Sequence, residues 1–464
     1  MGDPAGVMGN LMRRERRGLR LWNVGLVLAL VFVGALTVAG AVFLTGWELL
    51  GARGLKHERR IDSKTLFDLV KLAFGVVAGA GALVALVVAY RRQRVDEDGA
   101  RREATRLHTE RFTTAVSQLG DDSAAVRLGG VHALAGLADD APTNHLRQTC
   151  IDVLCAYLRL PYTAETDLPE DATARHAYQA SREVRHTIIR IIRDHTALGP
   201  EDFPASWQGY DLDFTGVVFD GGDFTGAVFA AGATVSFRGA DFSSGTVSFR
   251  EAEFAGGTVG FQSAGFSGGT VDFGGTLFSG GHVYFGRARF SDGQVHFGRA
   301  EFCGATVGFG QAEFSGGTVD FRGTPFSGGT VYFDQAEFTG SRVCFDLARF
   351  AGSEVGFDLA RFLGGEVGFG QAQFSGGRVD FDHAEFTGGT VGFEGARFSG
   401  GRTDFGGVQF SSGAVNFRRA RFSGGTVDFS GSGGPAPRSL LPVMRRLPLP
   451  DGLRVPARWH PSAP

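Results

Sequence analysis

Residues 246–269 read TVSFREAEFAGGTVGFQSAGFSGG, which is one twelve-residue unit written twice. The unit is V-x-F-x-x-A-x-F-x-G-G-x. Because alternate residues of a strand point to opposite sides, V-x-F and A-x-F each predict a short strand with one small or branched side chain and one ring inside. The glycine pair permits the positive φ angles of a sharp corner. The repeat therefore predicts a β-solenoid with stacked rings at its centre.

The array extends from Val235 to Phe429 without a gap, and Thr403 is the one departure from Val at the first position of the unit. A run of pentapeptides precedes it, with rings at Phe214, Phe219, Phe224 and Phe229. The period alone allows a two-sided coil of 12 residues or a four-sided coil of 24 residues. We favour 24, because two rings per unit, each of about 150 to 250 Å², need a wide centre.

The pentapeptide run resembles one coil of the pentapeptide-repeat protein family. This resemblance implies a right-handed quadrilateral β-helix, here with a 12-residue variant repeat. Upstream, RFTTAVSQLGDDSAAVRLGGVHALAGLADD (111–140) and CIDVLCAYLRLPY (150–162) resemble the armadillo-like helical segment that precedes the repeats in many actinobacterial members. The chain as a whole resembles the membrane-anchored type. Members of the family differ in role, so the resemblance implies a fold and not one activity.

Two uncharged stretches, 22–46 and 72–90, predict transmembrane helices, since about 20 apolar residues cross a bilayer. The first stretch is longer than the apolar region of a signal peptide, which argues against cleavage. Arginines precede the first stretch and follow the second, so we expect an inner-membrane, multi-pass protein with its N-terminus and its solenoid in the cytoplasm. Membrane lipid is therefore one expected partner.

The predicted fold is two transmembrane helices, a small all-α region and an all-β right-handed solenoid. The predicted domains are a basic N-terminus (1–20), a transmembrane hairpin (21–90), a helical adaptor (91–200), the solenoid (207–432) and a proline-rich disordered tail (433–464). Gly75 and Gly79 form a GxxxG pair that brings two helices close together. We expect it to pack within the hairpin, with a homodimer through this pair or through the solenoid end as the alternative.

Composition excludes several kinds of chemistry. The net charge of −3 gives no footprint for direct nucleic-acid binding. No lysine follows Lys71, which removes lysine catalysis from the repeats. The four cysteines lack zinc-ligand spacing and indicate free thiols. The SGGTVDF units lack the second Gly-x-Asp of calcium-binding repeats. We therefore predict no catalytic residue, no metal and no cofactor.

One feature could still suggest a cation site, namely aspartates just before the first phenylalanine of some units. They are Asp272, Asp320, Asp380, Asp404 and Asp428. Other units hold unrelated residues at this position, so we interpret the aspartates as solvated surface.

These observations predict a non-enzymatic, membrane-anchored scaffold or protein-interaction module whose protein partner the sequence does not name. The alternative is a DNA-mimic inhibitor or protector of a type II topoisomerase, as the resemblance implies for some members. That function requires an acidic surface, and here acidic residues only slightly outnumber arginines. A second alternative is a polysaccharide-acting β-helix enzyme. No inserted loop interrupts the repeat to form a cleft, which disfavours that alternative.

Overall fold

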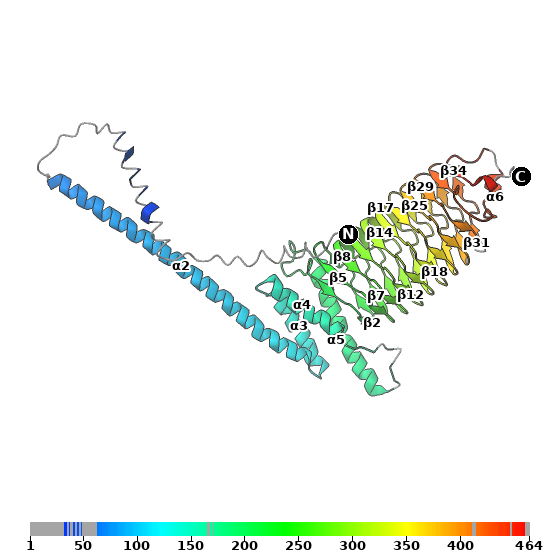
Figure 1. The fold of residues 1–464 in the computed structure, drawn as a ribbon. Helices are drawn as coiled ribbons and strands as arrows, with labels where there is room; N and C mark the ends of the chain where they lie inside the picture. Colours follow the sequence, from blue (N-terminus) through cyan, green and yellow to red (C-terminus); the bar gives the residue numbers. More distant parts are fainter. Residues whose placement is uncertain are drawn as a thin grey trace. The chain divides into compact units, whose positions relative to one another are not determined.

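A computed structural model describes residues 63–459, apart from 164, 166–167, 170, 411–413 and 446–447, together with scattered residues between 32 and 48. The chain divides into two compact units, 1–106 and 107–464. The second unit contains a group of helices followed by a β-solenoid, which Figure 1 shows in cyan to red. The order of elements thus confirms the predicted helical region followed by a solenoid.

The prediction of two membrane spans is wrong for the part of the chain that the structure describes, where no helix is long and apolar enough to cross a membrane. The prediction of a multi-pass inner-membrane protein rested on these two spans, so it is wrong for the same reason. The stretch 22–46 lies largely outside the described residues. The stretch 72–90 belongs to helix α2 (Ser63–Leu119). Nine of its nineteen residues are Gly or Ala, which contribute less apolar surface per residue than Leu, Val or Phe.

Three further helices follow the end of α2. They are α3 (Ala124–Asp139), α4 (Asn144–Leu158) and α5 (Ala172–Ala197). The side chain of Thr143 caps α4 by accepting a hydrogen bond from Leu146 N, and Asp171 caps α5 in the same way. Gly130 lets α3 approach the end of α2, since a Cβ there would lie 2.6 Å from Leu119 N. These helices share one core with the first solenoid coils.

Three parallel sheets form the solenoid. Sheet B contains β2 (Val218–Phe219), β6 (Asp241–Phe242), β9 (Gly265–Phe266), β12 (Arg289–Phe290), β15 (Glu313–Phe314), β18 (Glu337–Phe338), β22 (Arg361–Phe362), β26 (Glu385–Phe386) and β30 (Gln409–Phe410). Sheet C contains β3 (Gly222–Asp223), β7 (Thr246–Ser248), β10 (Thr270–Asp272), β13 (Gln294–His296), β16 (Thr318–Asp320), β19 (Arg342–Cys344), β23 (Glu366–Gly368), β27 (Thr390–Gly392) and β31 (Ala414–Asn416).

Sheet A bends around the Gly-Gly corners and covers two sides of each coil, which we name side A1 and side A2. The strands β8 (Glu253–Gly260), β11 (Leu277–Tyr284), β14 (Glu301–Gly308) and β17 (Pro325–Tyr332) begin on side A2 and end on side A1. Side A1 also holds β1 (Leu212–Asp213), β5 (Thr234–Ser236), β21 (Glu354–Gly356), β25 (Arg378–Asp380), β29 (Arg402–Asp404), β33 (Thr426–Asp428) and β34 (Leu453–Arg454). Side A2 also holds β4 (Val228–Phe229), β20 (Arg349–Phe350), β24 (Gln373–Phe374), β28 (Arg397–Phe398) and β32 (Arg421–Phe422).

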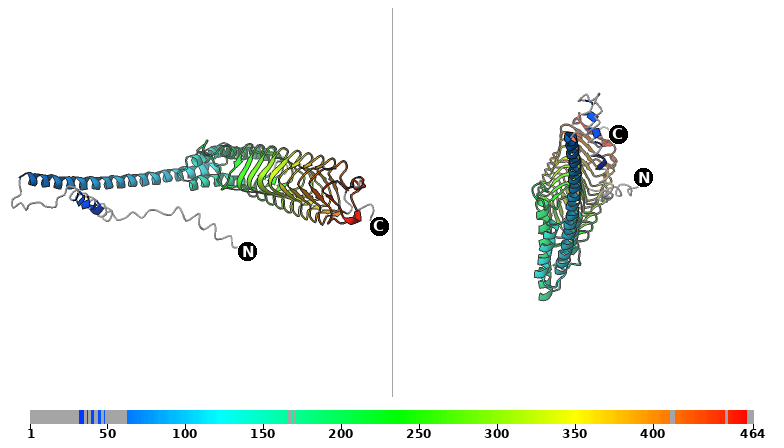
Figure 2. Two further views of the ribbon diagram at one scale, coloured as in Figure 1. Left: turned by 90° about the horizontal axis from the view of Figure 1, so that it is seen from above. Right: turned by 90° about the vertical axis from the view of Figure 1, so that its left-hand side faces the viewer.

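The strand register decides the size of the coil. Val283 pairs with Val259 and with Val307, so equivalent residues are 24 apart. Each coil therefore has four sides, A1, B, C and A2, and contains two sequence units, which confirms the 24-residue prediction. The coil is right-handed and repeats for about ten turns. Figure 2 shows the coils stacked along one axis.

Phenylalanine rings fill the centre in continuous stacks. The rings of Phe261 and Phe285 are parallel, with centroids 4.7 Å apart, and Phe285 stacks on Phe309 at 4.6 Å. Within one coil, Phe261 meets Phe273 edge-on at 81°. Both geometries suit the quadrupole of the ring. Thr276 replaces the usual Ala, and its buried hydroxyl donates a hydrogen bond to the carbonyl of Phe249 at 2.7 Å. The core is therefore apolar, with this polar group satisfied.

The described C-terminal residues up to Trp459 cap the solenoid, and for these residues the prediction of a disordered tail is wrong. A short helix α6 (Leu441–Met444) precedes β34, which pairs with β33, and a 3₁₀ turn η3 (Ala457–Trp459) follows. The Trp459 ring lies 5.7 Å from that of Phe410 and 5.9 Å from that of Phe429. Prolines suggested disorder, but the open end of the core offers apolar rings that this segment covers.

Candidate functional site

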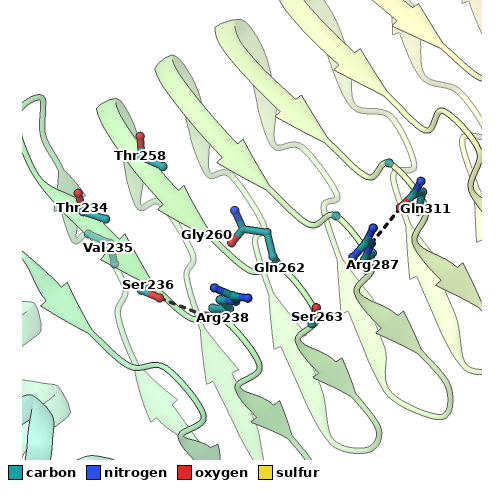
Figure 3. A pocket seen from close by; sticks show the side chains of 12 residues that line it. Thr234, Val235, Ser236, Arg238, Thr258, Gly260, Gln262, Ser263, Arg287 and Gln311 are labelled. Carbon is teal, nitrogen blue, oxygen red and sulfur yellow. Dashed lines mark hydrogen bonds between the residues drawn. The ribbon is translucent and has the colours of Figure 1, made fainter. Parts of the chain in front are cut away.

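The outer surface of the second to fifth coils contains a polar groove at the corner between sides A1 and B. It has a volume of about 420 Å³. We name it the Arg–Gln groove and define it by its lining residues, which are Thr234, Val235, Ser236, Arg238, Thr258, Gly260, Gln262, Ser263, Gly286, Arg287, Gly310 and Gln311. Figure 3 shows these residues spread over successive coils.

Glycines make this corner hollow. The position after the first phenylalanine of each coil holds Arg238, Gln262, Gly286, Gly310 and Asp334 in turn. Two successive coils thus lack a side chain where their neighbours carry a large one. A Cβ atom added at Gly286 would contact only the carbonyl oxygen of Gly310, at 3.5 Å. The floor of the groove at Gly286 therefore has room for a side chain.

Guanidinium and amide groups line the groove. Arg287 Nε donates a hydrogen bond to Gln311 Oε1 at 2.9 Å, and Gln311 Nε2 donates to Gln335 Oε1 at 2.9 Å. Figure 3 shows Arg238 and Arg287 on either side of Gln262. Both arginines are exposed, and neither forms an ion pair with any residue that the structure describes. This arrangement can bind carboxylates, which accept two hydrogen bonds from one guanidinium.

A second groove, of about 450 Å³, lies between α5 and the start of sheet C. It contains Arg182, His186 and Arg193, which suggests an anion site. These side chains already interact with carboxylates of the same chain. Arg182 Nε lies 3.2 Å from Asp220 Oδ2, and Arg193 forms ion pairs with Asp194 and Asp223. We interpret this cluster as the joint between the helices and the solenoid.

Asp220 is the centre of that joint. The carboxylate is buried, accepts hydrogen bonds from Tyr162 (2.6 Å) and Tyr178 (2.7 Å), and lies 3.3 Å from His186 Nε2. Burial alone would raise the pKa of Asp220, but the hydrogen bonds from His186 and the tyrosines hold the pKa well below its usual range. Burial and the bond to Asp220 raise the pKa of Tyr178 to about 12. The network therefore contains a stable carboxylate and two neutral phenols.

A second polar node joins α3 and α5 to the loop before the solenoid. His195 Nε2 lies 3.1 Å from Asp139 Oδ1, and its ring stacks on Trp207 with centroids 4.3 Å apart. Trp207 Nε1 donates to the same carboxylate at 3.3 Å. Burial lowers the pKa of His195, but the bonds to Asp139 and to the Ile191 carbonyl outweigh it, so the pKa is raised.

The aspartates singled out in the sequence do not form one ladder. Asp272 and Asp320 lie on sheet C with His296 between them. Asp380, Asp404 and Asp428 stack on consecutive strands of side A1. There, each carboxylate has an arginine beside it, at Arg378, Arg402 and Arg454 respectively. Among the residues that the structure describes, no group of three or more His, Cys, Asp or Glu is arranged to hold a metal ion.

Sequence reasoning missed another carboxylate group on the same side. Asp334, Asp358 and Asp382 occupy one corner position of three successive coils, next to Asp380. Burial raises the pKa of Asp358 to about 6, and repulsion from Asp380, Asp334 and Asp382 adds to this. One oxygen, Asp358 Oδ1, is buried and has no hydrogen-bond partner among the described residues. The signal was in the sequence, because the predicted 24-residue coil places these three residues, each 24 apart, at the same position of successive coils.

No protein-family model matches the chain, and no curated protein sequence matches it either. The structure itself shows the type of fold. The chain is a β-solenoid with regularly spaced phenylalanines, which is consistent with a pentapeptide-repeat fold. All four cysteines are free, and Cys303 is exposed, as expected for unpaired thiols.

Proposed function

We propose that the solenoid is a non-enzymatic protein-interaction module, and that the Arg–Gln groove receives an extended acidic segment of a partner protein. The observation that carries this proposal is the pair Arg238 and Arg287 on a glycine floor, with no carboxylate bound to either among the described residues. An extended chain fits because the groove follows the solenoid axis over several strand spacings of about 4.8 Å. Carboxylates of the segment would then meet guanidinium and amide donors.

The uniform register supports an interaction role over catalysis. Equivalent residues remain 24 apart from Val235 to Asp428, so no inserted loop rises above a side to enclose substrate. The proposal therefore assigns no catalytic residue, metal or cofactor to the chain. Rigid ladders of outward side chains suit recognition of another protein, as is common for solenoids.

Mimicry of DNA receives less support than binding of an acidic segment. The outward column of sheet B mixes both signs within adjacent coils. Its charged members are Asp241, Arg289, Glu313, Glu337, Arg361 and Glu385. Arg361 already bridges Glu337 at 2.6 Å and Glu385 at 3.6 Å. A phosphate backbone would require a continuous negative column, so topoisomerase inhibition is not proposed.

Binding of fluorescent peptides to the full chain tests the proposal. We expect a library of eight-residue Glu/Asp-rich peptides to contain binders whose affinity falls as salt rises. The pair Arg238→Glu/Arg287→Glu should weaken binding about ten-fold or more, because two charge-assisted contacts become repulsive. Arg289→Glu is the matched control, since Arg289 is also exposed but lies on sheet B, outside the groove.

A second variant separates shape from charge. Gly286→Gln keeps both arginines and fills the floor, where a Cβ has room. We expect it to reduce peptide binding as strongly as the charge reversal. Binding that is unchanged in both groove variants, or equally reduced by Arg289→Glu, would contradict the assignment of the site.

A further inference from the structure

One outward column on side A2 separates charge along the solenoid. It stands immediately before the second phenylalanine of alternate units, on consecutive hydrogen-bonded strands. We name it the Glu–Arg strip, and its members in order are Glu253, Leu277, Glu301, Pro325, Arg349, Gln373, Arg397 and Arg421. The first half is acidic and the second half is basic, with Pro325 at the change.

The charged side chains of the strip form no ion pair within the part of the chain that the structure describes. Glu301, Arg349, Arg397 and Arg421 are exposed, and none forms an ion pair with a residue that the structure describes. Glu253 accepts one hydrogen bond, from Ser279 Oγ at 2.8 Å. Sheet B differs, because Arg361 is held there between two glutamates. The strip therefore presents charge that nothing in the described chain neutralises.

The neighbouring outward column of side A2 is flat. All of its side chains are small, and its members are Ala255, Ser279, Cys303, Ser327, Ala351, Ser375, Ser399 and Ser423. Small side chains let a second surface approach the strand closely. Ser327 belongs to the same coil as Pro325, with three members of this column before it and four after it.

Symmetry makes the strip complementary to itself. A two-fold axis along the strand at Pro325 leaves three members of the strip before it and four after it, so only Arg421 has no counterpart within the strip. It brings Glu301 of one copy opposite Arg349 of the second copy, and Glu253 opposite Arg397. Leu277 then faces Gln373, and Pro325 faces Pro325. A parallel arrangement would instead place Glu301 against Glu301, with like charges in contact.

We propose that two copies of this chain associate in antiparallel fashion through the Glu–Arg strip. The surface is narrow, because eight strands about 4.8 Å apart and about 10 Å wide offer roughly 350 Å² per copy. This is less than the roughly 800 Å² per partner of a stable complex. The dimer is accordingly weak, and its affinity falls as salt screens the ion pairs.

Sedimentation equilibrium of the full chain at low and high salt tests the charge pairing. We expect Glu301→Arg alone and Arg349→Glu alone to weaken self-association about ten-fold or more, since each change breaks both symmetry-related pairs. The two single variants mixed together should associate again, because every contact between them has opposite charges. The double variant Glu301→Arg/Arg349→Glu should also associate as the unaltered chain does.

Cross-linking tests the axis itself. In a Cys303→Ser background, Ser327→Cys places one thiol of each copy at the two-fold axis, and a short bis-maleimide should join them. Ser399→Cys is the matched control, because the same axis keeps its two copies about 29 Å apart, six strand spacings. No cross-link at 327, or equal cross-linking at 399, would overturn the proposed geometry.

Other occupants give different results. Self-association that is unchanged in both Glu301→Arg and Arg349→Glu would show that another surface, such as α2 or the end of the solenoid, forms the dimer. Binding of polyglutamate that is lost in Arg349→Glu and Arg397→Glu, by a chain that stays monomeric, would assign the basic half to a polyanion instead. Either result would overturn the antiparallel pairing.

Discussion

The hydroxyl of Tyr178, on α5, donates a 2.7 Å hydrogen bond to the carboxylate of Asp220, in the first coil of the solenoid. This bond joins the helical part of the second unit to the start of the repeats. Tyr162 and His186 hold the same carboxylate, so the joint depends on one ionised group. Its protonation should therefore be visible in the stability of the protein.

Asp220→Asn should destabilise the protein by about 3 kcal/mol at neutral pH, because it removes a buried charge from its donors. The folded pKa of Asp220 lies below its unfolded value of about 3.9. Its stabilisation is therefore complete above that value and is lost as pH falls toward the folded pKa. Thermal unfolding from pH 7 to pH 2 should show that Asp220→Asn loses less stability in acid than the unaltered protein does. Glu394→Gln, at an exposed position, is the control, and an equal acid loss in both variants would contradict the assignment.

Asp358→Asn should have the opposite effect. Burial and neighbouring carboxylates raise the folded pKa of Asp358 to about 6, so ionisation costs stability as pH rises above the unfolded value. Allowing for solvent screening at this partly exposed site, we expect about 1 kcal/mol of stabilisation at pH 7. The gain should vanish near pH 3, where the carboxyl is protonated in both states. Chemical denaturation at the two pH values measures it, and a gain that is equal at both would point to a cause other than charge.

Phe333→Ala should cost about 3 to 5 kcal/mol, as expected for a large buried ring. Phe333 is fully buried and stacks on Phe309 at 4.6 Å and on Phe357 at 4.9 Å. Phe422 is only partly buried and, among the residues that the structure describes, stacks only on Phe398, at 5.1 Å, so Phe422→Ala should cost clearly less. Urea unfolding compares the two variants. Equal costs would mean that ring stacking between coils contributes little at the centre.

The repeat spacing was sufficient to predict the solenoid, its ringed core and its corners, because each unit carries its own strands and glycines. The 24-residue coil followed from ring size. Absence of charge was a poor guide to membrane spans, since apolar surface and not neutrality governs insertion. The tail was mispredicted from its prolines, because the apolar end that Trp459 covers exists only once the coils are stacked.

The sequence by itself determined which residues point inward, since alternation and the twelve-residue period are local properties. Only the tertiary structure decided which outward residues become neighbours. Arg238 and Arg287 border one groove, and Asp334 and Asp358 repel each other, because the coil closes every 24 residues. Asp220 meets Tyr162 although 58 residues separate them. Such contacts depend on how the chain returns upon itself, which no local pattern encodes.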